Sequence, residues 1–212
     1  MTFEELSVAV AALPEPLGGY RRLTSVTGSG YGSFSMVAPE GWVDWFLTQD
    51  PSPIVEVAAS QDSAWSLGFA ASLERDNEVA GEGQAVGRVA IADPESASLQ
   101  VVSVTLSPAG DLDASQLKDV VVEALSATGA VERVDAYRIE GGGWLEVVVG
   151  FDNPLTGWVE PVVEQKMFLL DETNGWLWSV TCNLHESIAD DEAERCTMIQ
   201  RSFVPFGPVV EE

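Results

Sequence analysis

Hydrophobic residues recur at every second position over several short segments of the chain. Leu145, Val147, Val149 and Phe151 show this clearly, because residues two apart share one face of a strand. The same period predicts strands at residues 34–37, 54–58, 65–73, 86–92, 99–106, 130–139, 143–151, 159–170 and 176–182. The segment 171–175 between the last two contains Asn-Gly, which is the strongest short signal for a β-hairpin.

A helical period replaces this alternation at the N-terminus. Thr2 and Glu5 have the spacing of a capping box, the apolar residues that follow lie three or four positions apart, and Pro14 ends the run. This short amphipathic helix either packs on the domain or serves a partner. Residues 15–32, which are rich in Gly and Ser, are predicted to form a connection.

Two more helices are predicted, over residues 113–127 and 189–202, where apolar residues again fall on one helical face. Asp113 caps the first of them, and its side-chain type is favoured at a helix start. Strands predominate, and the helices appear at set points among them. The sequence therefore predicts an α+β fold: a mainly antiparallel sheet of about six to eight strands covered by helices, with an extra N-terminal helix.

The two cysteines of the chain are predicted to lie in the interior. In the last strand Trp176 and Trp178 share a side with Cys182, and that side is buried because large aromatic side chains gain most from burial. Cys196 belongs to the apolar stripe of the final helix, and this stripe ends at Phe203. Cys182 and Cys196 can therefore form a disulfide between sheet and helix, or remain a free buried pair. Neither thiol has the exposure that a reactive cysteine requires.

Four segments have the features of one known fold. Gly32–Trp42 matches an opening strand with a Pro-x-Gly-Trp turn, and Val101–Leu106 followed by the helix at 113–127 matches a central strand and helix. Ala136–Val180 matches a meander of hairpins, and Cys196–Phe203 matches a terminal helix that ends in Ile-x-x-Ser-Phe. Together these segments resemble the Mog/PsbP-like α/β sandwich, and within it the actinobacterial LpqN-like lipoproteins.

This resemblance implies a division of the chain and a kind of function. Residues 30–205 would form the sandwich domain, residues 1–29 an N-terminal helix with its connection, and residues 206–212 a C-terminal tail. Proteins of this fold bind a Ran-type GTPase, photosystem subunits or envelope components, and they are not generally enzymes. The resemblance therefore implies a non-enzymatic protein-binding or accessory module, linked to the cell envelope or secretion. No functional residue of those proteins is matched in this chain.

The charge of the chain narrows the choice of partner. The 212 residues include 34 acidic and 10 basic ones, for a formal net charge of -24. Such a surface repels phosphate backbones and anionic lipid heads, so we expect no nucleic-acid partner and favour a basic protein. No apolar run reaches the roughly 18 residues of a membrane span, and no signal peptide is recognised, so a cytoplasmic protein is expected. A disulfide would instead indicate an oxidising compartment.

The remaining candidate residues leave several functions open. Trp42, Trp45 and Trp158 lie near turns and would either line an exposed partner surface or pack in the core. A small apolar-ligand carrier is the first alternative function. The second is a hydrolase that would have to use His185, the only histidine, as its base. No catalytic residue, metal ligand or cofactor is predicted.

Overall fold

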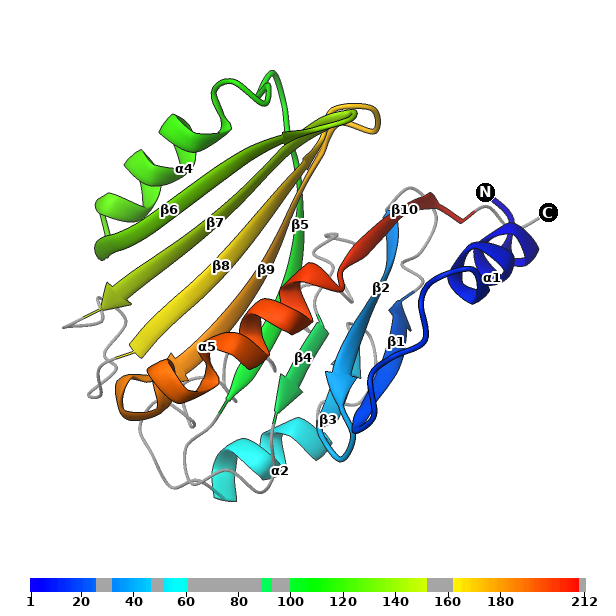
Figure 1. Ribbon diagram of the computed structural model, residues 1–212, viewed down its shortest axis with the longest axis horizontal. Coiled ribbons are helices and arrows are strands. Elements are labelled where there is room, and N and C mark those ends of the chain that lie inside the picture. The colour runs from blue at the N-terminus through cyan, green and yellow to red at the C-terminus, as the bar shows by residue number, and fades with distance from the viewer. Residues whose placement is uncertain (26–31, 47–51, 61–88, 93–99, 152–161, 210–212) are drawn as a thin grey trace.

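A computed structural model describes residues 1–25, 32–46, 52–60, 89–92, 100–151 and 162–209 (Figure 1). In this part of the chain the helices are α1 (Phe3–Ala11), α2 (Ser52–Ser60), α4 (Leu117–Ser126) and α5 (Glu186–Arg201). The strands are β1 (Tyr20–Ser25), β2 (Gly32–Pro39), β3 (Val43–Phe46), β4 (Val89–Ala92), β5 (Val101–Pro108), β6 (Ala130–Ile139), β7 (Gly142–Phe151), β8 (Val162–Asp171), β9 (Trp176–His185) and β10 (Val204–Pro208).

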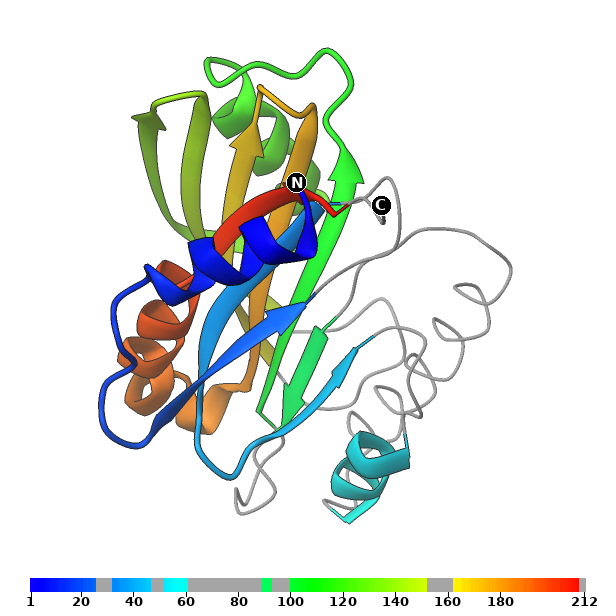
Figure 2. The ribbon, with the colours of Figure 1, turned by 90° about the vertical axis from the view of Figure 1, so that its right-hand side faces the viewer.

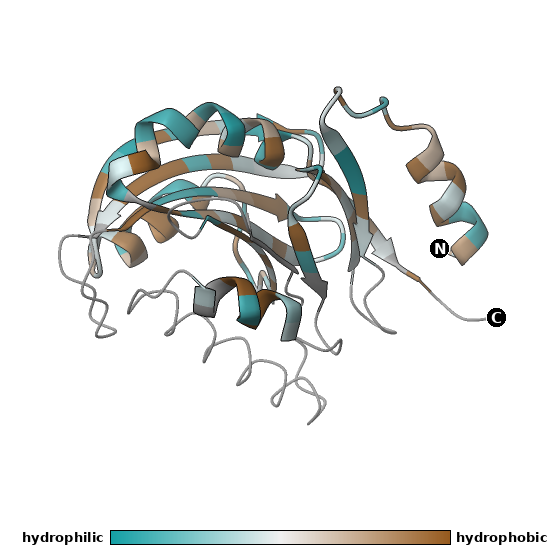
Figure 3. Cartoon of the chain, turned by 90° about the horizontal axis from the view of Figure 1, so that it is seen from below, coloured by the Kyte–Doolittle hydropathy of each residue, from teal (hydrophilic) through white to brown (hydrophobic). Residues whose placement is uncertain are grey.

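The strands form two antiparallel sheets. The larger has seven strands in the order β3-β4-β5-β9-β8-β7-β6, and the smaller has three in the order β1-β2-β10. Helix α5 contacts β8, β9 and β2, whereas α4 contacts β6 and β7. The two helices lie on opposite faces of the large sheet, as the view from below shows (Figure 3). The small sheet lies on the same side as α5, with α1 beyond it (Figure 2).

Three aromatic rings join the two sheets, and we call them the aromatic cluster. Phe34 of β2 meets Trp178 of β9 edge to face, with ring centroids 5.7 Å apart. Phe203, which follows α5, lies 5.3 Å from each of the other two rings. Because Ile199 and Cys196 of α5 belong to the same buried core, the terminal helix does cover the tryptophan-bearing side of the sheet. This arrangement is the one that the sequence predicts.

Strand β2 approaches the aromatic cluster very closely. A Cβ atom added to Gly32 would lie 2.6 Å from Cζ2 of Trp178, so only glycine fits there without a shift of the indole. Farther along β2 the hydroxyl of Ser202 accepts a hydrogen bond from the Val37 amide (2.8 Å) and donates one to the Ile199 carbonyl (2.6 Å). The end of α5 is therefore fixed to β2 by both packing and hydrogen bonds.

The opposite face of the large sheet has its own core beneath α4. Leu117 and Val121 of the helix pack on the alternating residues of β7 that the sequence singles out. Asp113 caps the turn that leads into α4: its carboxylate accepts hydrogen bonds from the amides of Ser115 (2.7 Å) and Gln116 (3.1 Å). The helix itself begins later than predicted: the N-cap of α4 is Gln116, which makes no side-chain capping bond, so Asp113 caps the preceding turn and not the helix.

The predicted α+β fold is confirmed, and the strands predicted around residues 34–37, 99–106, 130–139, 143–151 and 176–182 are present with shifted ends. The strand predicted at residues 65–73 lies outside the described residues. Three other predictions are wrong, and they concern residues 54–58, 15–32 and 206–212.

Residues 54–58, predicted as a strand, lie in α2. This helix begins at Ser52 and has Pro53 in its first turn, where the fixed φ of proline suits a helix. Residues 15–32 are not only a connection, because they contain β1, which pairs along its whole length with β2. Residues 206–212 are not only a tail, because β10 extends to Pro208 and pairs with β2.

One ion pair fastens the last turn of α5 to the large sheet. The guanidinium of Arg201 donates two hydrogen bonds to the carboxylate of Glu146, at 2.9 and 3.1 Å. Glu146 is 6% exposed and also accepts a bond from the indole N–H of Trp144 (3.3 Å). The Arg201 hydrogen bond lowers the pKa of Glu146 below its ordinary value of 4.5. The pair thus stabilises the folded state whenever Glu146 is ionised.

We predict that Arg201→Ala lowers the free energy of unfolding by about 1–2 kcal/mol at pH 7, because it leaves a buried carboxylate with fewer hydrogen bonds. A lowered pKa gives stability that is present above the unfolded-state value and lost as the pH falls through the folded-state value. The difference in the free energy of unfolding between Arg201→Ala and the parent protein should therefore shrink below about pH 4. Urea unfolding across this pH range measures it.

The control is Arg195→Ala on the same helix. Arg195 pairs with Glu192 at 2.9 Å near the surface, and such pairs contribute about 0.5 kcal/mol or less. An equal loss of unfolding free energy in the two variants would show that the Glu146–Arg201 pair stabilises the fold no more than a surface pair does.

Candidate partner-binding groove

Helix α1 begins with the capping box that the sequence predicts. The Thr2 hydroxyl accepts a hydrogen bond from the Glu5 amide (3.1 Å), and the Glu5 carboxylate accepts one from the Thr2 amide (2.8 Å). The helix ends at Ala11, before Pro14 and Pro16 carry the chain in extended form towards β1. This local chemistry places a short helix and a proline-containing linker beside the small sheet.

Much of the apolar surface of α1 and its linker is unused by the fold. Leu6 is the buried residue of the helix, whereas Phe3 is about half exposed. Val8 is 66% exposed and Leu17 in the linker is 68% exposed. Large apolar side chains that remain this exposed are candidates for contact with a partner.

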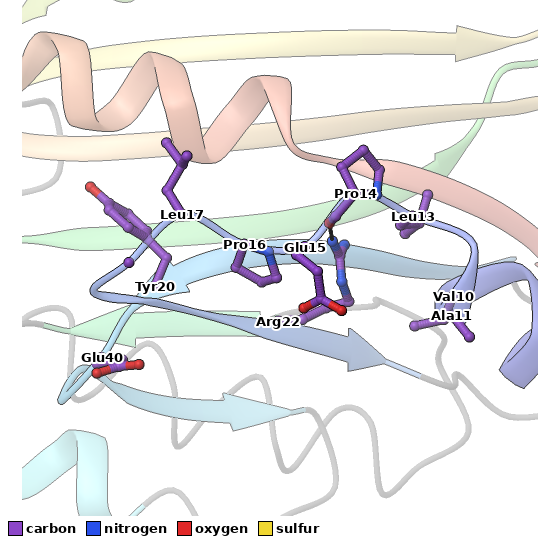
Figure 4. A pocket seen from close by; sticks show the side chains of 11 residues that line it. Val10, Ala11, Leu13, Pro14, Glu15, Pro16, Leu17, Tyr20, Arg22 and Glu40 are labelled. Atoms are coloured by element: carbon purple, nitrogen blue, oxygen red, sulfur yellow. Dashed lines mark hydrogen bonds between the residues drawn. The ribbon is translucent and has the colours of Figure 1, made fainter.

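An open hollow of about 560 Å³ lies between the end of α1, the linker and β1. We call it the N-terminal groove, and Figure 4 shows its side chains. Its lining residues come from one stretch of chain and from the turn after β2: Val10, Ala11, Leu13, Pro14, Glu15, Pro16, Leu17, Gly18, Tyr20, Arg22 and Glu40. The size is that of a pocket for a small molecule or for a few residues of a peptide.

Arg22 is the cation among the described lining residues of the N-terminal groove, and it is already engaged. The guanidinium of Arg22 donates to the carbonyl oxygen of Pro14 and to the hydroxyl of Ser35 (3.3 Å), and so ties the linker to the small sheet (Figure 4). The side chains of Glu15 and Glu40 form no ion pair with any described residue. The groove therefore presents a lining of mixed polar and apolar surface, with two carboxylates that form no ion pair among the described residues, a combination that suits a segment with apolar and cationic side chains.

Of the three tryptophans proposed as a partner surface, the structure describes the side chain of Trp42. Trp42 is only 6% exposed and belongs to the core with the aromatic cluster, so it does not contribute to a surface. Trp42 is buried because the turn after β2 folds its side chain inward. Arg21 of β1 donates a hydrogen bond to the Trp42 carbonyl (2.8 Å). Trp45 lies in β3, but its side chain is outside the description, as is the whole of Trp158.

Cys182 of β9 and Cys196 of α5 meet in the core, as predicted. Both are buried and both are free thiols in the structure. Burial raises the pKa of the Cys182 thiol well above its usual range, and its hydrogen bond with Cys196 raises it further. A protonated, buried thiol is a poor nucleophile. The pair is thus placed for a disulfide, which remains a prediction.

The described residues give little support to metal or hydrolytic chemistry. His185 is the last residue of β9 and pairs with Val162 of β8, and its side chain is outside the description. Within the described ranges no three side chains of His, Cys, Asp or Glu are grouped as a metal site would require. None of the described helices is long and apolar enough to cross a membrane.

Sequence reasoning missed the N-terminal groove, although one signal was present. The segment 20–25 contains Tyr, Leu and Thr, which favour strands, and Leu23 lies between polar residues in the alternation of a half-buried strand. The glycines on either side of this short segment indicated a loop, so the strand was not predicted. Without β1, the linker has no second wall and no groove can be foreseen.

Comparison with known proteins identifies the fold. No protein-family model matches the chain, and no curated protein sequence matches it. The crystal structure of LpqN, involved in cell envelope biogenesis of Mycobacterium tuberculosis, matches with a TM-score of 0.53 and 8% identity, over 97% of this chain and 98% of that one. The chain therefore has the Mog/PsbP-like α+β sandwich fold, as the sequence resemblance predicts.

Two other structures are similar at lower scores. Cyanobacterial PsbP from Synechocystis sp. PCC 6803 matches with a TM-score of 0.49 and 10% identity, over 90% of this chain and 95% of that one. The Saccharomyces cerevisiae Ran-binding protein Mog1p matches with a TM-score of 0.48 and 11% identity, over 87% of this chain and 94% of that one. At such identities a likeness shows the fold and not the function, and the fold assignment rests on LpqN.

We predict that protein purified without reductant contains fewer than two titratable thiols per chain when it is denatured. Closing a loop of about 15 residues with a disulfide would stabilise the fold by about 3 kcal/mol in the chain-entropy model, so reductant should lower the melting temperature. The Cys196→Ser variant is the control, because its melting temperature should not respond to reductant. Two thiols per chain, before and after treatment with a disulfide oxidant, would contradict the bridge.

Proposed function

We propose that the protein is a non-enzymatic accessory module that holds a cationic, partly apolar segment of another protein in its N-terminal groove. The observation that carries the proposal is the groove itself: an open hollow with a mixed polar and apolar lining, the exposed side chain of Leu17 in its wall, and two carboxylates that form no ion pair with a described residue. Short-range contact would come from Leu13, Pro14 and Tyr20. Cationic side chains of the partner would pair with Glu15 and Glu40.

The charge of the whole chain supports the same class of partner. A net charge of -24 attracts a basic protein over long distances and speeds its encounter with the surface. Affinity then depends on the apolar contacts in the groove, because exposed ion pairs contribute little on their own. A link to the cell envelope forms part of the proposal. It is supported by the fold shared with LpqN, which is involved in cell envelope biogenesis.

The groove fits this role better than the fold fits the alternatives. A small-ligand carrier needs an open space between sheet and helices, but Phe34, Met36, Trp178 and Ile199 fill the described space beneath α5, each with almost no exposure. A hydrolase would have to use His185, and no contact of that side chain is available to support one. Protein binding is therefore the function that we propose.

A binding assay with two defined peptides tests the proposal. We expect a fluorescent hexapeptide of alternating Lys and Val to bind with micromolar affinity in an anisotropy titration, and a Glu–Val peptide of the same length not to bind. The double variant Glu15→Lys, Glu40→Lys should weaken binding about tenfold, because two ion pairs are replaced by repulsion.

The matched control is the double variant Glu123→Lys, Glu194→Lys, which makes the same change in net charge at exposed positions on α4 and α5. It should bind the cationic peptide nearly as well as the parent protein. Equal losses in the two double variants would mean that the peptide follows net charge alone, and the groove would not be its site.

A further inference from the structure

We infer that Asn174 is a site of spontaneous chemical modification, at which the side-chain amide is converted to a carboxylate, and that Asp171 holds this reaction back in the folded chain. Asn174 lies in the turn between β8 and β9, at the upper end of the large sheet in Figure 1. This turn contributes no residue to the described lining of the N-terminal groove. The inference therefore goes beyond the proposed function and does not depend on it.

The residue that follows Asn174 makes it the reactive asparagine of the chain. Gly175 comes next, whereas Asn77, Asn153 and Asn183 are followed by Glu, Pro and Leu. Glycine has no Cβ atom to shield its backbone nitrogen, and its backbone rotates freely, so this nitrogen can reach the preceding side chain. A larger side chain, or the missing N–H of proline, hinders the same approach at the other three asparagines.

The reaction needs only water. The Gly175 nitrogen forms a bond to Cγ of Asn174 and loses its proton to solvent. The Cγ–Nδ2 bond breaks, and the side-chain nitrogen takes up a proton and leaves as ammonia, so that a cyclic succinimide remains. Water then opens the ring at either carbonyl. Opening at Cγ gives aspartate, and opening at the backbone carbonyl gives isoaspartate, whose main chain is longer by one methylene group.

The turn has room for this chemistry. Asn174 and Gly175 are both exposed, and a Cβ atom built on Gly175 would have no neighbour within 4 Å. The space on that side of the turn is thus open to water. Gly175 has a φ of +71°, which lies in the left-handed region that favours glycine. The hairpin therefore selects the same residue that makes Asn174 reactive.

The folded turn opposes the reaction through the carboxylate of Asp171. Its Oδ1 atom accepts a hydrogen bond from the Asn174 amide (3.0 Å), and its Oδ2 atom accepts one from the Asn174 side-chain nitrogen (2.7 Å). Asp171 is itself fixed at the end of β8, opposite Trp176 on one side and Gly142 on the other. The reaction expels the nitrogen that Asp171 binds, so a charge-assisted hydrogen bond has to be broken.

Modification would loosen the junction between this turn and the loop that leads to α4. The Gly175 carbonyl accepts a hydrogen bond from the Ala109 amide (2.9 Å), and the Glu172 carboxylate accepts one from the Ala114 amide (2.7 Å). A carboxylate at position 174 replaces the donor to Asp171 with a like charge. Isoaspartate also displaces Gly175, because it lengthens the main chain. The loop would then lose its bond to the Gly175 carbonyl.

Incubation of the protein in warm, mildly alkaline buffer tests the site. Mass spectrometry of proteolytic peptides should detect the conversion of amide to acid first at Asn174, and isoaspartate methyltransferase should label the same peptide. The chain unfolded in urea should react about tenfold faster than the folded chain, because the hydrogen bonds to Asp171 are then absent.

The Asp171→Asn variant tests the protection directly. Asparagine offers one acceptor oxygen where aspartate offers two, so one of the two hydrogen bonds is lost, and we expect Asn174 to react about tenfold faster. The matched control is Glu172→Gln, which makes the same change in charge one residue away and keeps an acceptor for the Ala114 amide. Its rate should equal that of the parent chain.

Hydrogen exchange measures the consequence for the loop. Protein modified at Asn174 and separated by anion exchange should exchange the amides of residues 109–114 faster than fresh protein, and unchanged exchange there would contradict the loosened junction. Three other results would each overturn the inference. They are conversion at other asparagines but not at Asn174, equal rates in the folded and unfolded chain, and equal rates in Asp171→Asn and Glu172→Gln. None of these outcomes bears on peptide binding by the groove.

Discussion

The contact of Phe34, Trp178 and Phe203 holds the two sheets together, and most of the fold depends on it. Each ring comes from a different part of the chain: β2 of the small sheet, β9 of the large sheet and the residue after α5. The indole N–H of Trp178 is buried without a hydrogen-bond partner among the described residues, which costs about 1–3 kcal/mol. Packing must exceed that cost, and the close approach of Gly32 shows how tightly the cluster is enclosed.

The sequence predicts the elements whose periodicity is set by one-sided burial. Strands β7 and β9 and helix α5 each carry a run of large apolar residues at a regular spacing along one face, and this run reveals both their type and a buried side. The side of the sheet that α5 covers could be inferred because Trp176 and Trp178 share a face with Cys182. The predictions fail where tertiary contacts determine the conformation. Helix α2 has a short apolar run that fits a strand equally well, and β1 is a strand because β2 lies beside it.

The N-terminal groove illustrates the same limit at the level of function. Its walls are residues 10–22, which are close in sequence, together with Glu40 from the turn after β2. The sequence shows which residue types are present, but it does not show that Arg22 reaches back to Pro14 and ties the linker to the small sheet beside the groove. Conversely, Trp42 lies near a turn, where the sequence leaves a surface and a core position open, and the inward fold of that turn places it in the core.

The small sheet has a consequence for the order in which the chain folds. Its central strand, β2, lies between β1 and β10, and the bond between Val37 and Ser202 joins residues 165 positions apart. During synthesis β2 and β1 can form a hairpin early, but one edge of β2 must wait until nearly all the other described elements have been made. Contacts so distant in sequence slow folding and leave an unpaired strand exposed in the meantime. A nascent chain of this protein would therefore be most prone to aggregation just before its last strand emerges.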